Sequence, residues 1–194
     1  MAAGLDVEFR EDGIIFSSYP FAPASVHPSG VVGYAAIREV LPQMWPPEVR
    51  TLTGEVLFVS ATQKEQLLAA AARHALPLVA RVDVWSLILE PFLDTEFDEQ
   101  DQQRTLMMLQ DNGVGRELCD ALRQEFGPAM YHYNFATFLW EWVHLGLYDL
   151  LCAIELGPRK ALLWRQGRSF ATFYWEAMEI AHRGRIIPQE IQLH

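Results

Sequence analysis

The sequence predicts an α+β protein. A small antiparallel sheet of four or five strands with one helix is expected in residues 1–76, and a bundle of about five helices in residues 77–194. Two observations lead to this class. Short strand-like segments separated by turn residues come first, and helical patterns follow, one of them unusually aromatic. Because no low-complexity linker separates the two subdomains, we expect them to share an interface.

Turn residues divide the N-terminal part into short strands. Apolar and β-branched residues favour strands over residues 5–9, 14–18, 31–41, 49–52 and 55–60. Gly13 ends a turn signal between the first two segments, and Gly54 does the same between the last two. The sequence therefore predicts two hairpins within one antiparallel sheet.

The first helix follows directly after these strands. Thr62 and Glu65 have the spacing of a capping box, in which the two side chains bond free amides at the start of a helix. Residues rich in Leu and Ala continue the pattern, and we expect a helix over residues 63–75.

Helical patterns dominate the second part of the chain. They predict helices over residues 83–89, 98–111, 115–126, 129–155 and 159–182. Gly113, Gly127 and Gly157 each follow one of these segments, as glycine often does where a helix ends. Proline follows the last two of these glycines, which strengthens the predicted helix ends.

Residues 129–155 are the expected centre of the helical part. Seven aromatic side chains lie between Tyr131 and Tyr148. A surface helix usually has a broad polar face, and this segment has none. We therefore expect one continuous, mostly buried helix with the other helices packed around it.

Composition and charge limit the class of protein. With 51% apolar and 21% charged residues, the chain resembles folded globular proteins. Its formal net charge of -10 argues against binding to nucleic acid and against adsorption to an anionic membrane. We see neither a signal peptide nor a membrane span, and we expect a cytoplasmic protein. Cys119 and Cys152 form no C-x-x-C pair, so we expect buried, reduced thiols and no cofactor.

An acidic run opens the helical part. Residues 83–101 contain seven acids and no base. A solvated loop and the preference of helix starts for acids explain the run structurally. Alternatively, the run is a surface for a basic protein partner, with the candidate residues Asp94, Glu96, Asp98, Glu99 and Asp101. Residues 159–185 carry six bases and two acids, so a second copy of this chain, in a homodimer, is one candidate partner.

A narrow polar stripe follows the aromatic helix. At 100° per residue, the polar side chains that fall within about 80° of one another are Asn134, Thr137, Glu141, His144, Tyr148 and Glu155. The stripe either touches water or lines a polar cleft. For a cleft, the candidate ligand-binding residues are Glu141, His144, Tyr148 and Asp149. Asp149 lies on the apolar side, where a carboxylate is either paired, for example with Arg165 or Arg168, or catalytic with a shifted pKa.

Two Glu-x-x-His pairs form a candidate metal site, with the ligands Glu141, His144, Glu179 and His182. A Glu and a His three positions apart point to one side of a helix, as in carboxylate metal bundles, and they suit Fe, Mn or Zn. The further single glutamates of such bundles are not evident on the other long helices. The alternative is that both histidines are hydrogen-bonded to neighbours or water.

Sequence motifs for catalysis are missing. We find no G-x-S-x-G elbow, no phosphate-binding loop and no dinucleotide fingerprint. The leading hypothesis is therefore a non-catalytic protein-interaction protein, of an adaptor or immunity-like kind, that uses its acidic surface. The alternative hypothesis is a metal-dependent enzyme or small-ligand binder with a polar cleft around Glu141 and His144.

Overall fold

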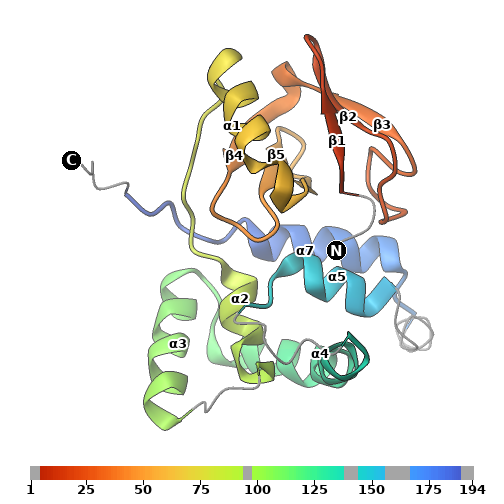
Figure 1. Cartoon of the computed structure of the whole chain (residues 1–194). Helices are drawn as coiled ribbons and strands as arrows, with labels where there is room; N and C mark the ends of the chain where they lie inside the picture. Colours follow the sequence, from red (N-terminus) through yellow and green to blue (C-terminus); the bar gives the residue numbers. More distant parts are fainter. Residues whose placement is uncertain (1–4, 94–97, 138–143, 156–166, 189–194) are drawn as a thin grey trace. The chain divides into compact units, whose positions relative to one another are not determined.

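The computed structural model describes residues 5–93, 98–137, 144–155 and 167–188, with the backbone alone for 134–137. The chain forms two compact units. Residues 1–82 together with 185–194 make the β unit, and residues 83–184 make the helical unit. Both units are coloured along the sequence in Figure 1. The α+β class is confirmed.

The first sheet is an antiparallel meander of β1 (Val7–Phe9), β2 (Gly13–Phe16) and β3 (Gly30–Gly33). Val7 pairs with Phe16 across the predicted first hairpin, which is confirmed. Gly13 sits where β2 passes close to β3. A Cβ atom there would lie 2.5 Å from the carbonyl oxygen of Val32, so the position requires glycine.

The second sheet contains β4 (Ile37–Leu41), β5 (Glu48–Thr51) and β6 (Val56–Phe58), again antiparallel. The hairpin of β5 and β6 confirms the second predicted hairpin. The prediction of a single sheet is wrong. The segment expected as one strand over residues 31–41 is interrupted by the 3₁₀ turn η1 (Tyr34–Ala36), so β3 and β4 pair in different sheets.

The helix after the strands is α1 (Lys64–Arg73), preceded by the 3₁₀ turn η2 (Ala61–Gln63). The predicted capping box is wrong, because no side chain caps α1 and the Thr62 hydroxyl contacts the Ser60 hydroxyl. Gln63 instead bonds the backbone of Val7. Its Oε1 accepts from the Val7 amide at 2.8 Å, and its Nε2 donates to the Val7 carbonyl at 2.8 Å. This side chain replaces a missing neighbour strand at the edge of the sheet.

Aromatic rings and buried charges fill the interior of the β unit. Edge-to-face contacts join the rings in the order Phe16, Tyr19, Phe21 and Phe58. The Arg50 Nε donates to the Glu48 carboxylate at 2.9 Å, and Arg50 is 1% exposed. Charges this deeply buried persist when they are paired and hydrogen-bonded.

Residues 77–82 extend the second sheet. The Val40 amide donates to the Pro77 carbonyl at 2.9 Å, and the Val79 amide donates to the Val40 carbonyl at 3.0 Å. Arg81 then reaches the buried carboxylate of Glu39 with Nε at 3.0 Å and Nη2 at 2.9 Å. Burial alone would raise the pKa of Glu39, but hydrogen bonds from Arg81 and Arg38 outweigh it and lower that pKa.

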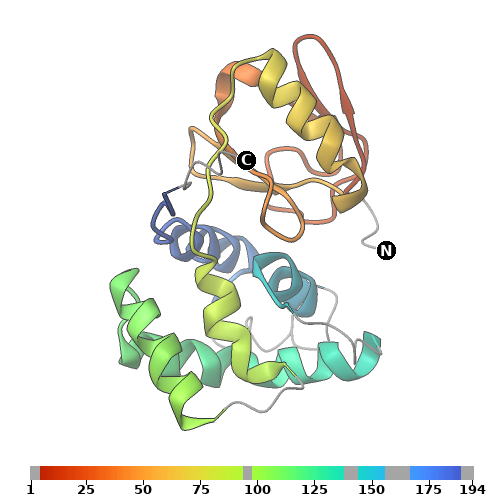
Figure 2. The ribbon, with the colours of Figure 1, turned by 60° about the vertical axis from the view of Figure 1, so that its left-hand side comes forward.

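Residues 185–187 pair with residues 80–82, on the side of this segment that faces away from β4. The Val82 amide donates to the Arg185 carbonyl at 3.0 Å, and the Ile187 amide donates to the Ala80 carbonyl at 2.8 Å. We call this pairing of residues 80–82 with 185–187 the closing bridge. The helical unit is therefore an insertion whose two ends are adjacent. Figure 2 shows residues 77–82 as the extended segment that leads into the first helix of that unit.

The closing bridge also sets the boundaries of the units. We expected a division into residues 1–76 and 77–194. In the structure the β unit continues to Val82 and takes up residues 185–194, because residues 77–82 are hydrogen-bonded into its sheet. The expected interface between the two parts stays a prediction.

The helical unit begins with α2 (Val84–Leu89), the 3₁₀ turn η3 (Glu90–Phe92) and α3 (Glu99–Asp111). Both predicted helices are confirmed. Asp83 and Asp98 cap them by accepting backbone N–H bonds from Ser86 and Asp101. After α3, Gly113 adopts a φ of 75°, the left-handed conformation expected at this helix end.

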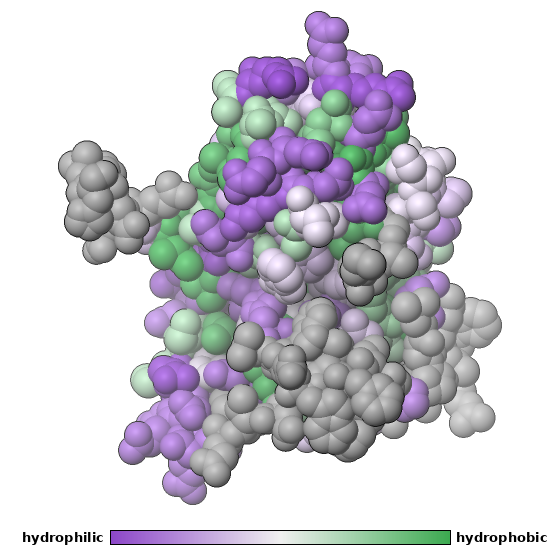
Figure 3. All heavy atoms as spheres, viewed as in Figure 1, coloured by the Kyte–Doolittle hydropathy of each residue, from purple (hydrophilic) through white to green (hydrophobic). Residues whose placement is uncertain are grey.

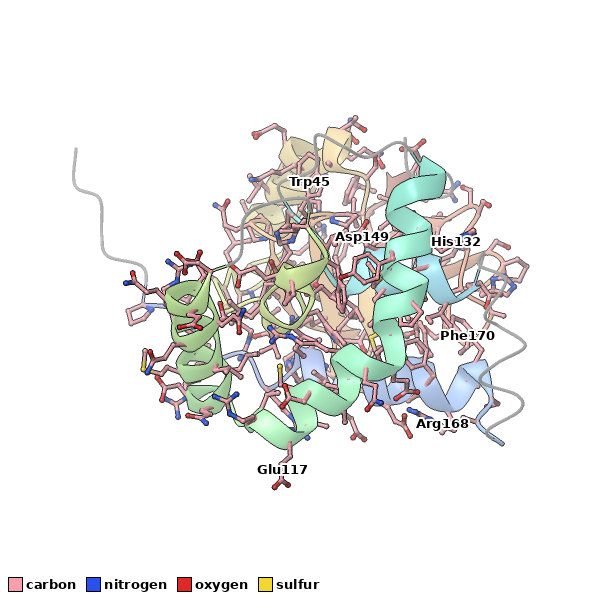
Figure 4. The ribbon with its side chains drawn as sticks, turned by 90° about the horizontal axis from the view of Figure 1, so that it is seen from below. Trp45, Glu117, His132, Asp149, Arg168 and Phe170 are labelled. Atoms are coloured by element: carbon pink, nitrogen blue, oxygen red, sulfur yellow. The ribbon has the colours of Figure 1, made fainter. Side chains whose placement is uncertain are left out.

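The next helix, α4 (Arg116–Thr137), runs through the predicted stop at Gly127-Pro128, so that prediction is wrong. Phe126, Ala129 and Met130 are all buried, and this packing holds the helix together across the proline. Figure 4 shows the bend of α4 near its middle, which a proline inside a helix explains. Gly127 allows a close approach, because a Cβ there would lie 2.9 Å from the Phe92 ring.

The last two described helices are α5 (Leu147–Glu155) and α7 (Phe170–Ala181). The prediction of one continuous helix over residues 129–155 is wrong, because residues 144–146 are not helical. The expected burial is also incomplete, since Tyr148 is buried while Tyr131 is 53% exposed. Residues 138–143, which include two of the tryptophans, lie outside the described residues.

Helix α2 occupies the centre of the helical unit, in contact with α3, α4 and α7. Trp85 on α2 is 1% exposed, and its Nε1 donates to the Ala177 carbonyl of α7 at 2.9 Å. Arg123 on α4 donates to the carbonyls of Leu87 and Ile88. Helix α2 is therefore the element that holds the helices on either side of it.

The adjacent ends of the insertion lead to a prediction. Deletion of residues 83–184, with Val82 joined to Arg185 through an Asn-Gly turn, should leave a folded β unit. The turn closes a pair of segments that are already hydrogen-bonded. We expect β-type circular dichroism and a cooperative thermal transition.

The matched control ends the chain at Val82 and so lacks residues 185–187. It should unfold at a lower temperature, because the two hydrogen bonds of the closing bridge are lost, at roughly 1 kcal/mol each. Loss of cooperative unfolding in the Asn-Gly variant would show that the β unit depends on the insertion.

Candidate functional site

A polar segment leads into α5 in the helical unit. We give the name polar turn to residues 144–149, the non-helical residues 144–146 and the first three residues of α5, which contain the predicted site residues His144, Tyr148 and Asp149. Tyr148 and Asp149 are buried, and the side chain of His144 is 31% exposed. The break in the predicted long helix therefore occurs at the residues proposed as its binding site.

Asp149 explains the start of α5. Its Oδ2 accepts a hydrogen bond from the Gly146 amide at 2.9 Å. Gly146 directly precedes α5, and Asp149 is the third residue of that helix. This is the reciprocal half of a capping box, in which the third side chain of a helix reaches back to the capping amide. The carboxylate also lies at the positive end of the helix dipole.

Burial nevertheless disfavours the ionised form of this carboxyl. Asp149 is 1% exposed. Burial raises the pKa of Asp149 to about 6, although the Gly146 amide, the charge of His144 and the Tyr133 hydroxyl act in the opposite direction. The Tyr133 hydroxyl of α4 lies 3.5 Å from Oδ1, and Figure 4 shows Asp149 beside α4. Of the two candidate partners of Asp149, Arg168 pairs instead with Glu125 and Glu176, and Arg165 lies outside the described residues.

Tyr148 and Cys152, one turn apart on α5, form a second buried polar contact. Their side chains are hydrogen-bonded to each other. Burial raises the pKa of Cys152 to about 12 and also raises the pKa of the Tyr148 hydroxyl. A thiol in this state is a poor nucleophile. The arrangement supports a structural role for both residues.

His144 connects the polar turn to the start of α2. Its Nδ1 lies 3.2 Å from the Ser86 hydroxyl, and its Nε2 lies 3.3 Å from the Asp83 carboxylate. The other oxygen of Asp83 accepts from the Ser86 amide at 3.0 Å. Two segments separated by about 60 residues in sequence are therefore held together by one imidazole.

Ser, His and Asp are also the residue types of nucleophilic hydrolases. Here the distance from Nδ1 to the Ser86 hydroxyl is at the long end of the hydrogen-bond range, and the 3.3 Å contact of Nε2 with Asp83 is an ion-pair distance that does not meet hydrogen-bond geometry. Asp83 is the N-cap of α2 and Ser86 is its third residue, so both already serve the start of that helix. The contacts support a role in joining helices better than a role in catalysis.

The other predicted metal ligands lie on α7 or outside the described residues. Glu179 is exposed on α7, His182 follows the end of α7, and Glu141 lies outside the described residues. Across the described part of the chain, no three His, Cys, Asp or Glu side chains gather closely enough to hold a metal ion. The four-residue metal site, which includes Glu141, stays a prediction.

The acidic run has partly structural roles. Asp98 caps α3 by accepting from the Asp101 amide at 2.8 Å, and Asp101 pairs with Arg104 at 2.9 Å. Glu99 is exposed. Asp94 and Glu96, also proposed for this surface, lie outside the described residues. The proposed partner surface is therefore described at three of its five positions.

Charge is unequally divided between the two units. Residues 83–184 contain 16 Asp and Glu against eight Lys and Arg, so the helical unit holds -8 of the net charge of -10. The exposed acids on and beside α3 and the start of α4 are Asp98, Glu99, Asp111, Glu117 and Asp120. Figure 3 shows hydrophilic side chains gathered over α3 at the lower left. We call these five residues the acidic surface.

Exposed methionines lie within this surface. Met107 is 54% exposed and Met108 is 40% exposed, both on α3. Methionine is common at surfaces that bind proteins, because its flexible side chain adapts to different partners. None of the helices that the structure describes has the length and apolarity to cross a membrane.

Comparison with known proteins adds no functional information. No protein-family model, no curated protein and no solved structure matches this chain.

Sequence reasoning missed three partners of the polar turn, namely Asp83, Ser86 and Tyr133. The pair Asp83 and Ser86 has the spacing of a helix N-cap and its third residue, so the cap itself was readable. Their contact with His144 was not, because it joins segments far apart in the chain. Tyr133 lies beyond the bend of α4 and reaches Asp149 from there. No helix was expected at Gly127-Pro128, so the approach of Tyr133 to Asp149 could not be predicted.

Burial of the thiols leads to a prediction. Cys119 and Cys152 should resist alkylation by iodoacetamide at pH 8 in the folded protein, because burial raises the pKa of both thiols. Intact-mass spectrometry should show no adduct over a period that labels both thiols in denaturant. Equal labelling rates in the folded and denatured protein would contradict the buried arrangement of α4 and α5.

Proposed function

We propose that this chain is a non-catalytic interaction protein whose helical unit binds a basic protein partner. The observation that carries the proposal is the division of charge, with -8 of the net charge of -10 in residues 83–184. Complementary charge steers a partner towards such a surface and orients it there.

The described arginines of the helical unit do not offset the acidic surface evenly. Arg168 pairs with two glutamates, and Arg123 donates to carbonyls of α2. Arg104, which pairs with Asp101, and Arg116 at the start of α4 are exposed and offset part of the charge, while Glu99, Glu117 and Asp120 are exposed as well. The carboxylates of Glu99, Glu117 and Asp120 are therefore accessible to a basic partner.

The apolar part of the surface adds a second contribution. Association driven by charge alone is weak at physiological salt, because exposed pairs contribute roughly 0–1 kcal/mol each. The exposed side chains of Met107 and Met108 can be buried by a partner, and burial of apolar area contributes about 25 cal/mol per Å². An adaptor or immunity-like role lies within this class.

Charge reversal tests the proposal. The triple variant Glu99→Lys, Glu117→Lys and Asp120→Lys should weaken binding of a captured partner at least tenfold, on the order of magnitude expected for several charges at an interface. The measurement is affinity capture with the intact chain, followed by titration of the identified partner at low and high salt.

The matched control carries the same change of net charge in the β unit, as Asp6→Lys, Glu11→Lys and Glu65→Lys, all of which are exposed. It should bind as the unchanged protein does. The proposal fails if both triple variants bind equally well, or if affinity does not change with salt.

The alternative, a metal-dependent enzyme or small-ligand binder around Glu141 and His144, stays a prediction. Its one described residue, His144, contacts Asp83 and Ser86. Metal analysis of the purified protein after supply of Fe, Mn and Zn distinguishes the two hypotheses. Stoichiometric metal that is lost in both Glu141→Ala and His144→Ala would favour the enzyme.

A further inference from the structure

We propose that Met107 and Met108 form a reversible oxidation site on α3. At this site a peroxide converts both thioethers to sulfoxides, and the apolar contribution of the two side chains to partner binding is lost. The site stands on the exposure and position of the two methionines, whereas its effect on a partner rests on the proposed function.

The methionines of this chain differ sharply in their access to solvent. Five of the six lie in the described residues. Met107 is 54% exposed and Met108 is 40% exposed, whereas none of the other three, Met44, Met130 and Met178, is more than 8% exposed. A thioether is oxidised only where the oxidant reaches its sulfur. Two neighbouring methionines on one helix are therefore open to oxidation, and three buried ones serve as internal references.

The chemistry is a transfer of one oxygen atom to each sulfur. The sulfur lone pair attacks one oxygen of hydrogen peroxide, so that an S–O bond forms while the O–O bond breaks, and the other oxygen leaves as water. Sulfur loses two electrons and the peroxide gains them. Methionine sulfoxide reductases reverse the step at the cost of two thiols, which become a disulfide while the oxygen leaves as water. Hydrogen peroxide is neutral, so the carboxylates of the acidic surface do not repel it.

Oxidation at these two positions leaves the packing of α3 intact. The side chains that α3 buries are those of Thr105, Leu106 and Leu109. Met108 contributes to the end of the helix through its carbonyl oxygen, which accepts a hydrogen bond from Asn112 Nδ2 at 2.7 Å. Its sulfur takes no part in that bond. The modification therefore changes the surface of the helical unit and not its core.

The neighbours of the pair suit the oxidised form. Arg104 precedes Met107 by three positions and Met108 by four, so it lies beside both on the helix surface. Its exposed guanidinium pairs with Asp101 and has further donors. A sulfoxide oxygen accepts hydrogen bonds, whereas a thioether sulfur accepts them only weakly. Oxidation therefore gives Arg104 and water new acceptors and makes this part of the surface polar.

This polarity works against burial by a partner. A sulfoxide that a partner covers loses its hydrogen bonds to water, and an unsatisfied polar group is costly to bury. The thioether, in contrast, contributes favourably when its apolar area is covered. A partner that covers both side chains should therefore bind the oxidised protein at least about fivefold more weakly.

Peptide mapping after peroxide treatment tests the site. In the intact chain, limiting hydrogen peroxide should oxidise Met107 and Met108 at least about tenfold faster than Met44, Met130 and Met178, because only the first two are exposed. All five should react at similar rates in denaturant. The thermal transition should not change on oxidation of the pair, and methionine sulfoxide reductases should remove both oxygen atoms. Equal rates in the folded protein, or unfolding on oxidation of the pair, would overturn the proposal.

Substitution separates the site from its effect on binding. Met107→Leu combined with Met108→Leu keeps apolar side chains of similar size and removes both sulfurs, and Met44→Leu is the matched control. Retention on a phenyl column, which reports exposed apolar surface, should fall on mild oxidation of the unchanged protein and of Met44→Leu. It should stay constant in the double variant. Unchanged retention of the fully oxidised pair would contradict the loss of apolar surface.

The partner identified by affinity capture gives the last measurement. Mild oxidation should weaken its binding to the unchanged protein at least about fivefold and leave its binding to the double leucine variant unaltered. If charge reversal weakens binding but oxidation does not, the proposed function stands and the oxidation site does not regulate it. If no partner is captured, the proposed function fails, while mapping and column retention still decide the oxidation site.

Discussion

The closing bridge is the constraint on which the architecture depends. Two hydrogen bonds within the β unit, from Val82 to Arg185 and from Ile187 to Ala80, hold together the two segments between which the helical unit is inserted. The salt bridge of Arg81 with Glu39 secures the same segment from the side of β4. When the two ends of an insertion are adjacent, its length and sequence can change without disturbing the sheet into which it is inserted. The acidic surface and the polar turn both belong to this inserted unit.

Within the helical unit, the interruption between α4 and α5 has a physical reason. Gly146 and Asp149 form the start of a new helix, α5, and this start interrupts the single helix that was expected over residues 129–155. This start places a carboxyl in the core, where the pKa shift from 3.8 to about 6 corresponds to about 3 kcal/mol in favour of the neutral form. His144 then ties the interruption to α2. Of the residues proposed for a cleft, His144 and Asp149 therefore contact the starts of α2 and α5.

Local signals in the sequence predicted much of the fold. The hairpin turn at Gly13, the helix start near Asp98 and the helix end at Gly113 all depend on a few residues, and each occurs as expected. Predictions that depended on tertiary contacts failed. Pro128 does not end α4, because buried neighbours hold the helix across it, and Gln63 bonds Val7 across 56 positions. The return of residues 185–187 to the sheet carries no local signal at all.

Disulfide formation tests directly whether the two segments of the closing bridge lie close together. Arg81 and Ile186 face each other as an antiparallel pair without mutual hydrogen bonds, and such pairs bring Cα atoms to about 4.5 Å, within reach of a disulfide. In the double variant Arg81→Cys and Ile186→Cys, mild oxidation of the folded protein should link the two new cysteines rapidly and completely. Peptide mapping identifies the link, and oxidation in denaturant gives the rate of chance encounter. A folded protein that forms this disulfide no faster than the denatured chain would contradict the insertion.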